Sequence, residues 1–148
     1  MRDMSSAPFH ILLVEDDPAD AGLAKRAIRQ GRILCDVHHA VDGVEALAYL
    51  RREGERYANA RRPDLILLDL NMPRLDGRGV LTAIKQDVEL RGIPVVVLTT
   101  SDVDRDVEAM YQLGANSFVT KPLDLQDFFS VISGLENYWF EIVKLPAK

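Results

Sequence analysis

The chain has 148 residues, enough to bury a self-sufficient hydrophobic core as one domain without help from a metal or disulfides. Its composition, 47% hydrophobic and 28% charged, is ordinary for a globular protein, and no apolar run approaches the ~20 residues of a membrane helix. The formal net charge of -5 argues against nucleic acid as the main partner, because phosphate contacts need a concentrated basic face.

The first strand-like segment, Phe9–Val14, is apolar and is followed directly by the three acids Glu15, Asp16 and Asp17. Asp17 and the proline after it predict a helix start, with Asp17 as the cap and the proline at the first helical position. This helix is expected to run to about Gln30. The first strand therefore brings a cluster of carboxylates to the edge of the sheet.

A weaker strand is predicted over Leu34–Ala40. His38 and His39 occupy neighbouring positions in it, so their side chains point to opposite faces and cannot chelate one metal ion together. We interpret both, and also His10, as ordinary strand residues rather than metal ligands.

A helix follows this strand and is expected to turn Val44, Leu47 and Leu50 toward the sheet. Gly54–Arg62 then predicts a polar connection that is longer than usual between two elements. It belongs to an arginine-rich stretch, which is usually a solvated loop.

The central strand is the most distinctive segment of the chain. An unbroken apolar run, Leu65–Leu68, lies between Pro63 and Pro73 and ends in Asp69. Such a run predicts a strand buried on both faces, with Asp69 where the chain leaves the sheet. Ligands bind at that edge of an open parallel sheet, although aspartate is also common where a loop begins.

Two more strands are predicted in the second half of the chain. A helix that buries Val80, Leu81 and Ile84 leads to the apolar strand Pro94–Leu98, which ends in Thr99. A further helix, beginning at Val103 or Asp104, ends at Leu113. The short strand Ser117–Thr120 follows it and ends in Lys121.

A long last helix is predicted from about Leu125 to Val143, with a sustained apolar stripe. Phe129 and Phe140 fall outside the stripe. They could pack against the flank of the domain itself, but we favour an exposed apolar surface that a partner completes.

Five strand–helix alternations predict an α/β fold in which a doubly wound, five-stranded parallel sheet has helices on both faces. The expected strand order is 2-1-3-4-5, that of flavodoxin-like folds, with an extended C-terminal helix. We expect one domain over residues 1–148, with its core at about 9–135 and the last helix reaching about 143. This order gathers five side chains around one pocket: Glu15, Asp16, Asp69, Thr99 and Lys121.

The chemistry of this pocket points to phosphoryl transfer. Three close carboxylates repel one another unless a cation lies among them, and Mg²⁺ suits a site with few protein oxygens and room for water. Lys121 and the Thr99 hydroxyl would contact a phosphoryl group. Asp69 is the best-placed nucleophile, and aspartate can form an aspartyl phosphate.

The chain resembles a response regulator receiver domain through four motifs in family order, which are jointly very specific. They are LLVEDDP at Leu12–Pro18, LLDLNMP at Leu67–Pro73, VLTT at Val97–Thr100 and FVTKP at Phe118–Pro122.

The resemblance implies a role for each matching position. The phosphoacceptor falls on Asp69, the acidic metal pair on Glu15 and Asp16, and a backbone carbonyl ligand on Asn71; Asp17 is expected to be only the helix cap. The switch hydroxyl falls on Thr99, the phosphate-pairing lysine on Lys121 and the switch aromatic on Phe118, which lacks the hydroxyl of the commoner tyrosine.

The function implied is that of a two-component response regulator, a signalling domain rather than an enzyme. A sensor histidine kinase would phosphorylate Asp69, and the output would pass through protein contacts. The connection 54–62 and the tail 136–143 resemble those of stand-alone regulators of phytochrome-type kinases, so the kinase could be a bacteriophytochrome and the protein a homodimer through its last helix.

The expected location is the cytoplasm. Cys35 is the only cysteine, so an intramolecular disulfide is impossible, and this cysteine usage fits a reducing compartment. Met1–Pro8 is short and polar and lacks the apolar stretch of a signal peptide.

Two other classes of protein fit parts of this pattern. A Mg²⁺-dependent phosphatase also uses an aspartate nucleophile, but it needs an acid two residues later, where this chain has Asn71. A nucleotide- or flavin-binding module would need a first loop rich in glycine or hydroxyls, whereas this loop is acidic and would repel an anion.

Overall fold

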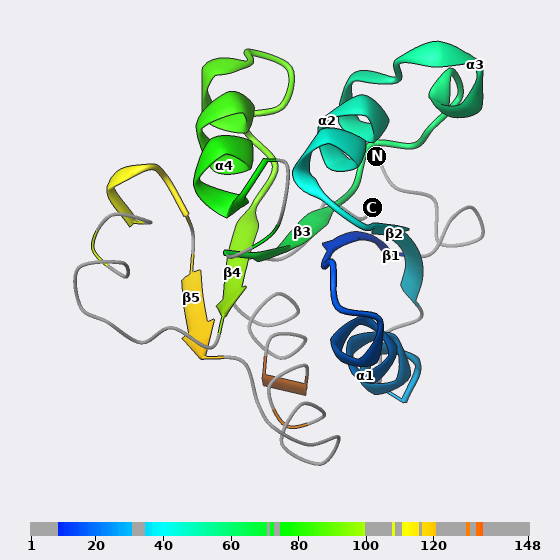
Figure 1. Ribbon diagram of the computed structural model, residues 1–148, viewed down its shortest axis with the longest axis vertical. Helices are drawn as coiled ribbons and strands as arrows, with labels where there is room; N and C mark the ends of the chain where they lie inside the picture. Colours follow the sequence, from blue (N-terminus) through cyan, green and yellow to red (C-terminus); the bar gives the residue numbers. More distant parts are fainter. Residues whose placement is uncertain are drawn as a thin grey trace, which may run out of the picture.

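The structure is a computed structural model that describes residues 9–30, 35–70, 72, 75–99, 108, 111–115, 117–120, 130 and 133–134. Five strands form one parallel sheet in the order β2-β1-β3-β4-β5, which confirms the predicted fold and strand order (Figure 1). The elements are β1 Phe9–Val14, α1 Pro18–Arg29, β2 Cys35–Ala40, α2 Gly43–Arg51, α3 Gly54–Tyr57, β3 Leu65–Asp69, α4 Gly77–Gln86, β4 Val95–Thr99 and β5 Ser117–Thr120.

Helices cover both faces of the sheet, as Figure 1 shows, with α1 on one face and α2 and α4 on the other. The alternation of side chains along each strand divides the interior into two cores. Leu12, Ile66 and Leu68 face α2 and α4. Leu13, Leu65 and Leu67 face α1. Both faces of β1 and β3 are therefore buried, which is why these strands read as continuous apolar runs.

An aspartate begins each of the three longer helices. Asp17 accepts a hydrogen bond from the Ala19 N–H of α1 at 2.8 Å. Asp42 and Asp76 cap α2 and α4 in the same way. The predicted starts of α1 and α4 are confirmed, as is the burial of Val80, Leu81 and Ile84 in α4.

The buried face of α2 differs from the prediction at one residue. Val44 is 45% exposed, so the expectation that it faces the sheet is wrong, whereas Leu47 and Leu50 are buried as predicted. The reason is the close packing of α2 on the segment around α4. A Cβ on Gly43 would lie only 2.2 Å from the Leu75 carbonyl oxygen, so glycine sits in the contact and Val44, one residue later, turns outward.

The polar connection predicted over Gly54–Arg62 contains a turn of helix, α3, and a buried residue, Tyr57, neither of which was predicted. The Tyr57 ring packs edge-on against Tyr49 and His38. Its hydroxyl donates a hydrogen bond to Glu45, and the Arg56 guanidinium lies 4.9 Å from the ring centroid. Burial, together with the hydrogen bond to Glu45, raises the pKa of Tyr57 above its usual value.

Two predicted helices fall largely outside the described residues. Glu108, Tyr111 and Gln112 are helical, in agreement with the helix predicted to end at Leu113. The last helix, with Phe129 and Phe140, stays a prediction apart from helical Ser130, Ser133 and Gly134. Among the described helices, none is long and apolar enough to cross a membrane.

Candidate functional site

Three carboxylates meet at the carboxyl edge of the sheet. Glu15 and Asp16 follow the end of β1, and Asp69 is the last residue of the neighbouring strand β3. The parallel register pairs Val14 with Leu68, so the next residue of each strand emerges at the same level. One carboxylate oxygen from each of Glu15, Asp16 and Asp69 lies within 4.8 Å of the other two, as the sequence predicts.

The three acids differ in their surroundings. Glu15 and Asp69 are buried, with exposed fractions of 4% and 6%, whereas Asp16 is exposed. The Asp17 N–H donates to the Glu15 carboxylate at 3.2 Å. Asp17 itself turns to the helix that it caps and is outside the acidic cluster. Two desolvated carboxylates and one solvated carboxylate at this spacing form a hard oxygen-donor set that can bind a divalent cation.

Strand β2 holds the backbone of Glu15 from the side. The Glu15 N–H donates to the Ala40 carbonyl at 3.0 Å, and the His39 Nε2 lies 2.7 Å from the Glu15 carbonyl oxygen. This contact was not predicted from the sequence, in which His39 has the features of an ordinary strand residue. The signal that could have found it is the predicted pairing of the first two strands, which brings the end of the second strand beside Glu15.

Gly77, at the start of α4, packs directly behind Asp69. Its N–H donates to the Leu70 carbonyl at 2.8 Å. A Cβ at this position would lie 2.6 Å from the Asp69 carbonyl oxygen and 2.8 Å from the Leu70 Cα. The sequence predicts a helix start here but does not reveal that it touches the exit of the central strand.

The side chains of four predicted site residues lie outside the described part of the structure. Thr99 ends β4, where Leu98 pairs with Asp69, so its backbone is at the expected edge, but its side chain is not described. Phe118 lies in β5, again without a described side chain. Asn71 and Lys121 lie outside the described residues, so their roles stay predictions.

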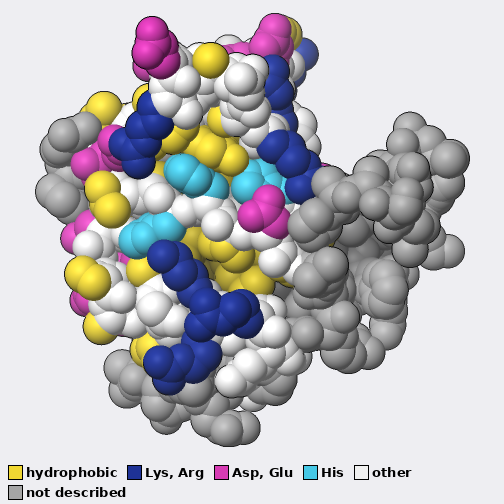
Figure 2. Space-filling model, turned by 90° about the vertical axis from the view of Figure 1, so that its right-hand side faces the viewer, with side chains coloured by type: hydrophobic (Ala, Val, Ile, Leu, Met, Phe, Trp, Pro, Cys, Tyr) yellow, Lys and Arg dark blue, Asp and Glu magenta, His cyan; other side chains and the backbone are white. Residues whose placement is uncertain are grey.

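The other two histidines belong to an aromatic cluster rather than to the acidic site. His38 stacks on Tyr49 at a centroid distance of 3.9 Å, and the His10 Nε2 lies 2.6 Å from the Tyr49 hydroxyl. Figure 2 shows histidine side chains gathered on one face, flanked by Lys and Arg. Among the described residues, the acidic cluster is the only group with metal-ligand spacing, and it contains no histidine.

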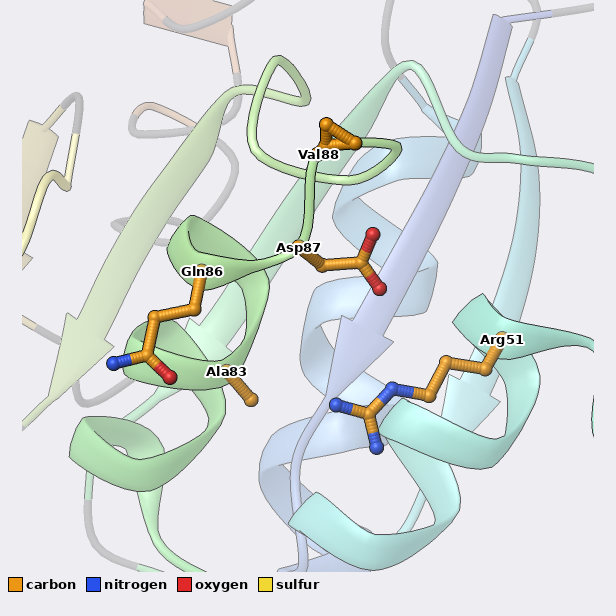
Figure 3. A pocket seen from close by; sticks show the side chains of 5 residues that line it. All are labelled: Arg51, Ala83, Gln86, Asp87 and Val88. Atoms are coloured by element: carbon orange, nitrogen blue, oxygen red, sulfur yellow. The ribbon is translucent and has the colours of Figure 1, made fainter.

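An open hollow between α2 and α4 lies away from the acids. It is lined by Arg51, Ala83, Gln86, Asp87 and Val88, and Figure 3 shows Arg51 reaching from α2 into the gap beside α4. Gly77 at the start of α4 touches the acidic edge, whereas the hollow lies at the other end of this helix, about 15 Å away at 1.5 Å per residue. The hollow is therefore separate from the acidic site.

Comparison with known proteins identifies the family. Residues 11–133 match the response regulator receiver domain. Response regulator Rcp1 of Synechocystis sp. is 48% identical over 147 residues, which cover 99% of each chain. The crystal structure of the phosphorylated cyanobacterial phytochrome response regulator RcpA has a TM-score of 0.87 at 48% identity, covering 95% of this chain and 99% of that one. The Mn²⁺-bound form of Rcp1 has a TM-score of 0.85 at 47% identity, covering 95% and 100%. The chain therefore belongs to the response regulator receiver domain family.

Proposed function

We propose that this two-component response regulator accepts a phosphoryl group from a sensor histidine kinase on the carboxylate of Asp69. The observation that carries the proposal is the position of Asp69 at the end of the central strand, with the Glu15 and Asp16 carboxylates within 4.8 Å. In the transfer, the bond from phosphorus to the kinase imidazole breaks and a bond to an Asp69 oxygen forms. Such a reaction asks mainly for in-line placement and charge neutralisation.

Glu15, Asp16 and Asp69 fit a small divalent cation, and we propose Mg²⁺, with the Asn71 backbone carbonyl as a further ligand. The support is the all-oxygen donor set, its spacing, and the Mn²⁺-bound relative. A bound cation would offset the negative charges of the carboxylates and of the incoming phosphoryl oxygens. The buried pair Glu15 and Asp69 would anchor it, while the exposed Asp16 leaves the site open to solvent.

The remaining members of the site would respond to the phosphoryl group. We assign the Thr99 hydroxyl and the Lys121 ammonium to its oxygens and Phe118 to the switch that follows. Thr99 lies at the end of β4 beside β3, and Phe118 lies in the edge strand β5, which supports this arrangement at the level of the backbone. The domain signals rather than turns over a substrate. Nothing in these residues favours the phosphatase alternative, because the position two residues after Asp69 is Asn71.

The partner kinase, the location and the assembly of the protein can also be proposed. The link of RcpA to phytochrome supports a bacteriophytochrome as the cognate kinase. We also propose that the protein is cytoplasmic and that its output passes through protein contacts without nucleic acid, as its single cysteine and its net charge of -5 favour. We further propose that residues 1–148 form a single domain and that the predicted last helix makes a homodimer. Light scattering at micromolar concentration, with and without beryllofluoride, tests the dimer, and a monomer mass under both conditions would contradict it.

The phosphoacceptor is tested by incubating the protein with Mg²⁺ and acetyl phosphate and then measuring its intact mass. The wild type is expected to gain one phosphoryl group and Asp69→Asn none. Asp87→Asn is the matched control, because Asp87 lies at the far end of α4 and its variant should be modified like the wild type. Modification of Asp69→Asn, or none in the wild type, would contradict the proposal.

A further inference from the structure

We propose that His39 is a positioning residue for the acidic cluster. It holds the carbonyl of Glu15 and, through that peptide group, sets the orientation of Asp16. This inference rests on the proposed function of the cluster as a cation site, and it adds a residue outside the three acids on which cation binding depends.

The hydrogen bond itself fixes which atom donates. The His39 Nε2 lies 2.7 Å from the Glu15 carbonyl oxygen, and a carbonyl oxygen can only accept, so the Nε2 carries the proton. The Glu15 N–H is bound on the same side by the Ala40 carbonyl at 3.0 Å. Both backbone polar groups of Glu15 are therefore held by the last two residues of β2.

This hold matters most for Asp16. A peptide group is planar and trans, so the direction of the Glu15 carbonyl also sets the direction of the Asp16 N–H and the position of the Asp16 Cα. The Asp16 side chain is exposed, so packing does not hold it against the two buried acids. The Glu15 carboxylate has its own restraint in the Asp17 N–H at 3.2 Å. Loss of the His39 contact should therefore loosen the Glu15–Asp16 peptide more than the Glu15 side chain.

His38 provides an internal comparison. Neighbouring strand residues point to opposite faces, and His38 stacks on Tyr49 in the aromatic cluster instead of contacting the acids. Both histidines are partly buried in the same edge strand. A change at His38 thus perturbs β2 without touching Glu15.

The experiment compares His39→Gln, His39→Leu and the control His38→Gln at one pH. Glutamine places its amide nitrogen near the position of the imidazole Nε2 and retains a donor, whereas leucine retains bulk without one. Titration calorimetry with Mg²⁺ is expected to show binding weakened about 10- to 100-fold in His39→Leu, the range for lost partners of metal ligands. His39→Gln and His38→Gln should bind like the wild type. Wild-type affinity in His39→Leu, or equal losses in both His39 variants, would overturn the proposal.

A second measurement in EDTA separates this proposal from the cation site itself. Hydrogen exchange of the amides of residues 15–17, followed by mass spectrometry, should be faster in His39→Leu than in His39→Gln while the unfolding temperatures of the two variants agree. Equal exchange in the two variants would overturn the positioning role. If the wild type binds no Mg²⁺, the proposed function fails, and the exchange comparison still decides whether His39 holds the peptide.

Discussion

Replacing Gly77 by alanine tests how tightly the start of α4 is packed behind the phosphoacceptor candidate. The added Cβ would lie 2.6 Å from the Asp69 carbonyl oxygen and 2.8 Å from the Leu70 Cα, well inside ordinary van der Waals contact. Both neighbours are backbone atoms, so no flexible side chain can move aside. The strand exit and the helix must separate instead. Gly77 does not have a positive φ, so the substitution probes packing rather than backbone strain.

We expect Gly77→Ala to lower the free energy of unfolding by about 1–3 kcal/mol, the usual cost of overpacking. The matched control is Gly22→Ala in α1, where a Cβ would meet nothing within 4 Å. Alanine inside a helix is favoured over glycine by roughly 0.5–1 kcal/mol, so this variant should be more stable than the wild type. The same change of residue thus has opposite signs at the two sites.

Urea denaturation in EDTA measures both effects, and Mg²⁺ titration of the folded variants measures the consequence for the site. Because the clash falls on the backbone of Asp69, Gly77→Ala should also weaken cation binding, whereas Gly22→Ala should leave it unchanged. The reasoning is refuted if Gly77→Ala is as stable as the wild type and binds the cation equally well.

Two further predictions concern Asp17 and His38. Asp17→Ala should lower the free energy of unfolding by about 1 kcal/mol because the helix cap is lost, whereas Asp17→Asn retains a cap. Both variants should bind the cation like the wild type in a Mg²⁺ titration. Weaker cation binding in either variant would show that Asp17 is a ligand. Burial, reinforced by His10, Arg56 and His39 and opposed by Glu45, lowers the pKa of His38 below 6.5. As the pH falls below 6.5, His38 therefore binds a proton more readily in the unfolded chain than in the folded protein, so the free energy of unfolding should decrease. Urea midpoints between about pH 8 and pH 5 should show a smaller loss in His38→Gln than in the wild type, and equal losses would contradict this assignment.

The sequence predicts the acidic site well because its signals are local. The largely apolar strand β1 is followed directly by acids, and the apolar strand β3 ends in one. Parallel strands bring their carboxyl ends to one edge, so Glu15, Asp16 and Asp69 could be placed together without coordinates. The turn signals at Asp17 and Asp76 likewise mark helix starts that the structure confirms.

The errors and omissions arise where the contact partner is distant in the chain. Val44 turns outward because α2 approaches the segment before α4 at Gly43, which the periodicity of α2 alone does not reveal. Tyr57 is buried because its ring packs against Tyr49 and His38 and its hydroxyl donates to Glu45, although its neighbours in sequence are polar.

By itself, the sequence determined the order of the elements, the buried strands and the edge at which the acids meet, because hydrophobic periodicity and parallel topology depend on residue type and spacing. Only the tertiary structure decided that His39 contacts the Glu15 carbonyl and that Gly77 lies against Asp69. These contacts join segments 24 and 8 residues apart, and a hydrogen bond or a close approach depends on distances of a few tenths of an ångström. Packing sets those distances, and no local pattern encodes them.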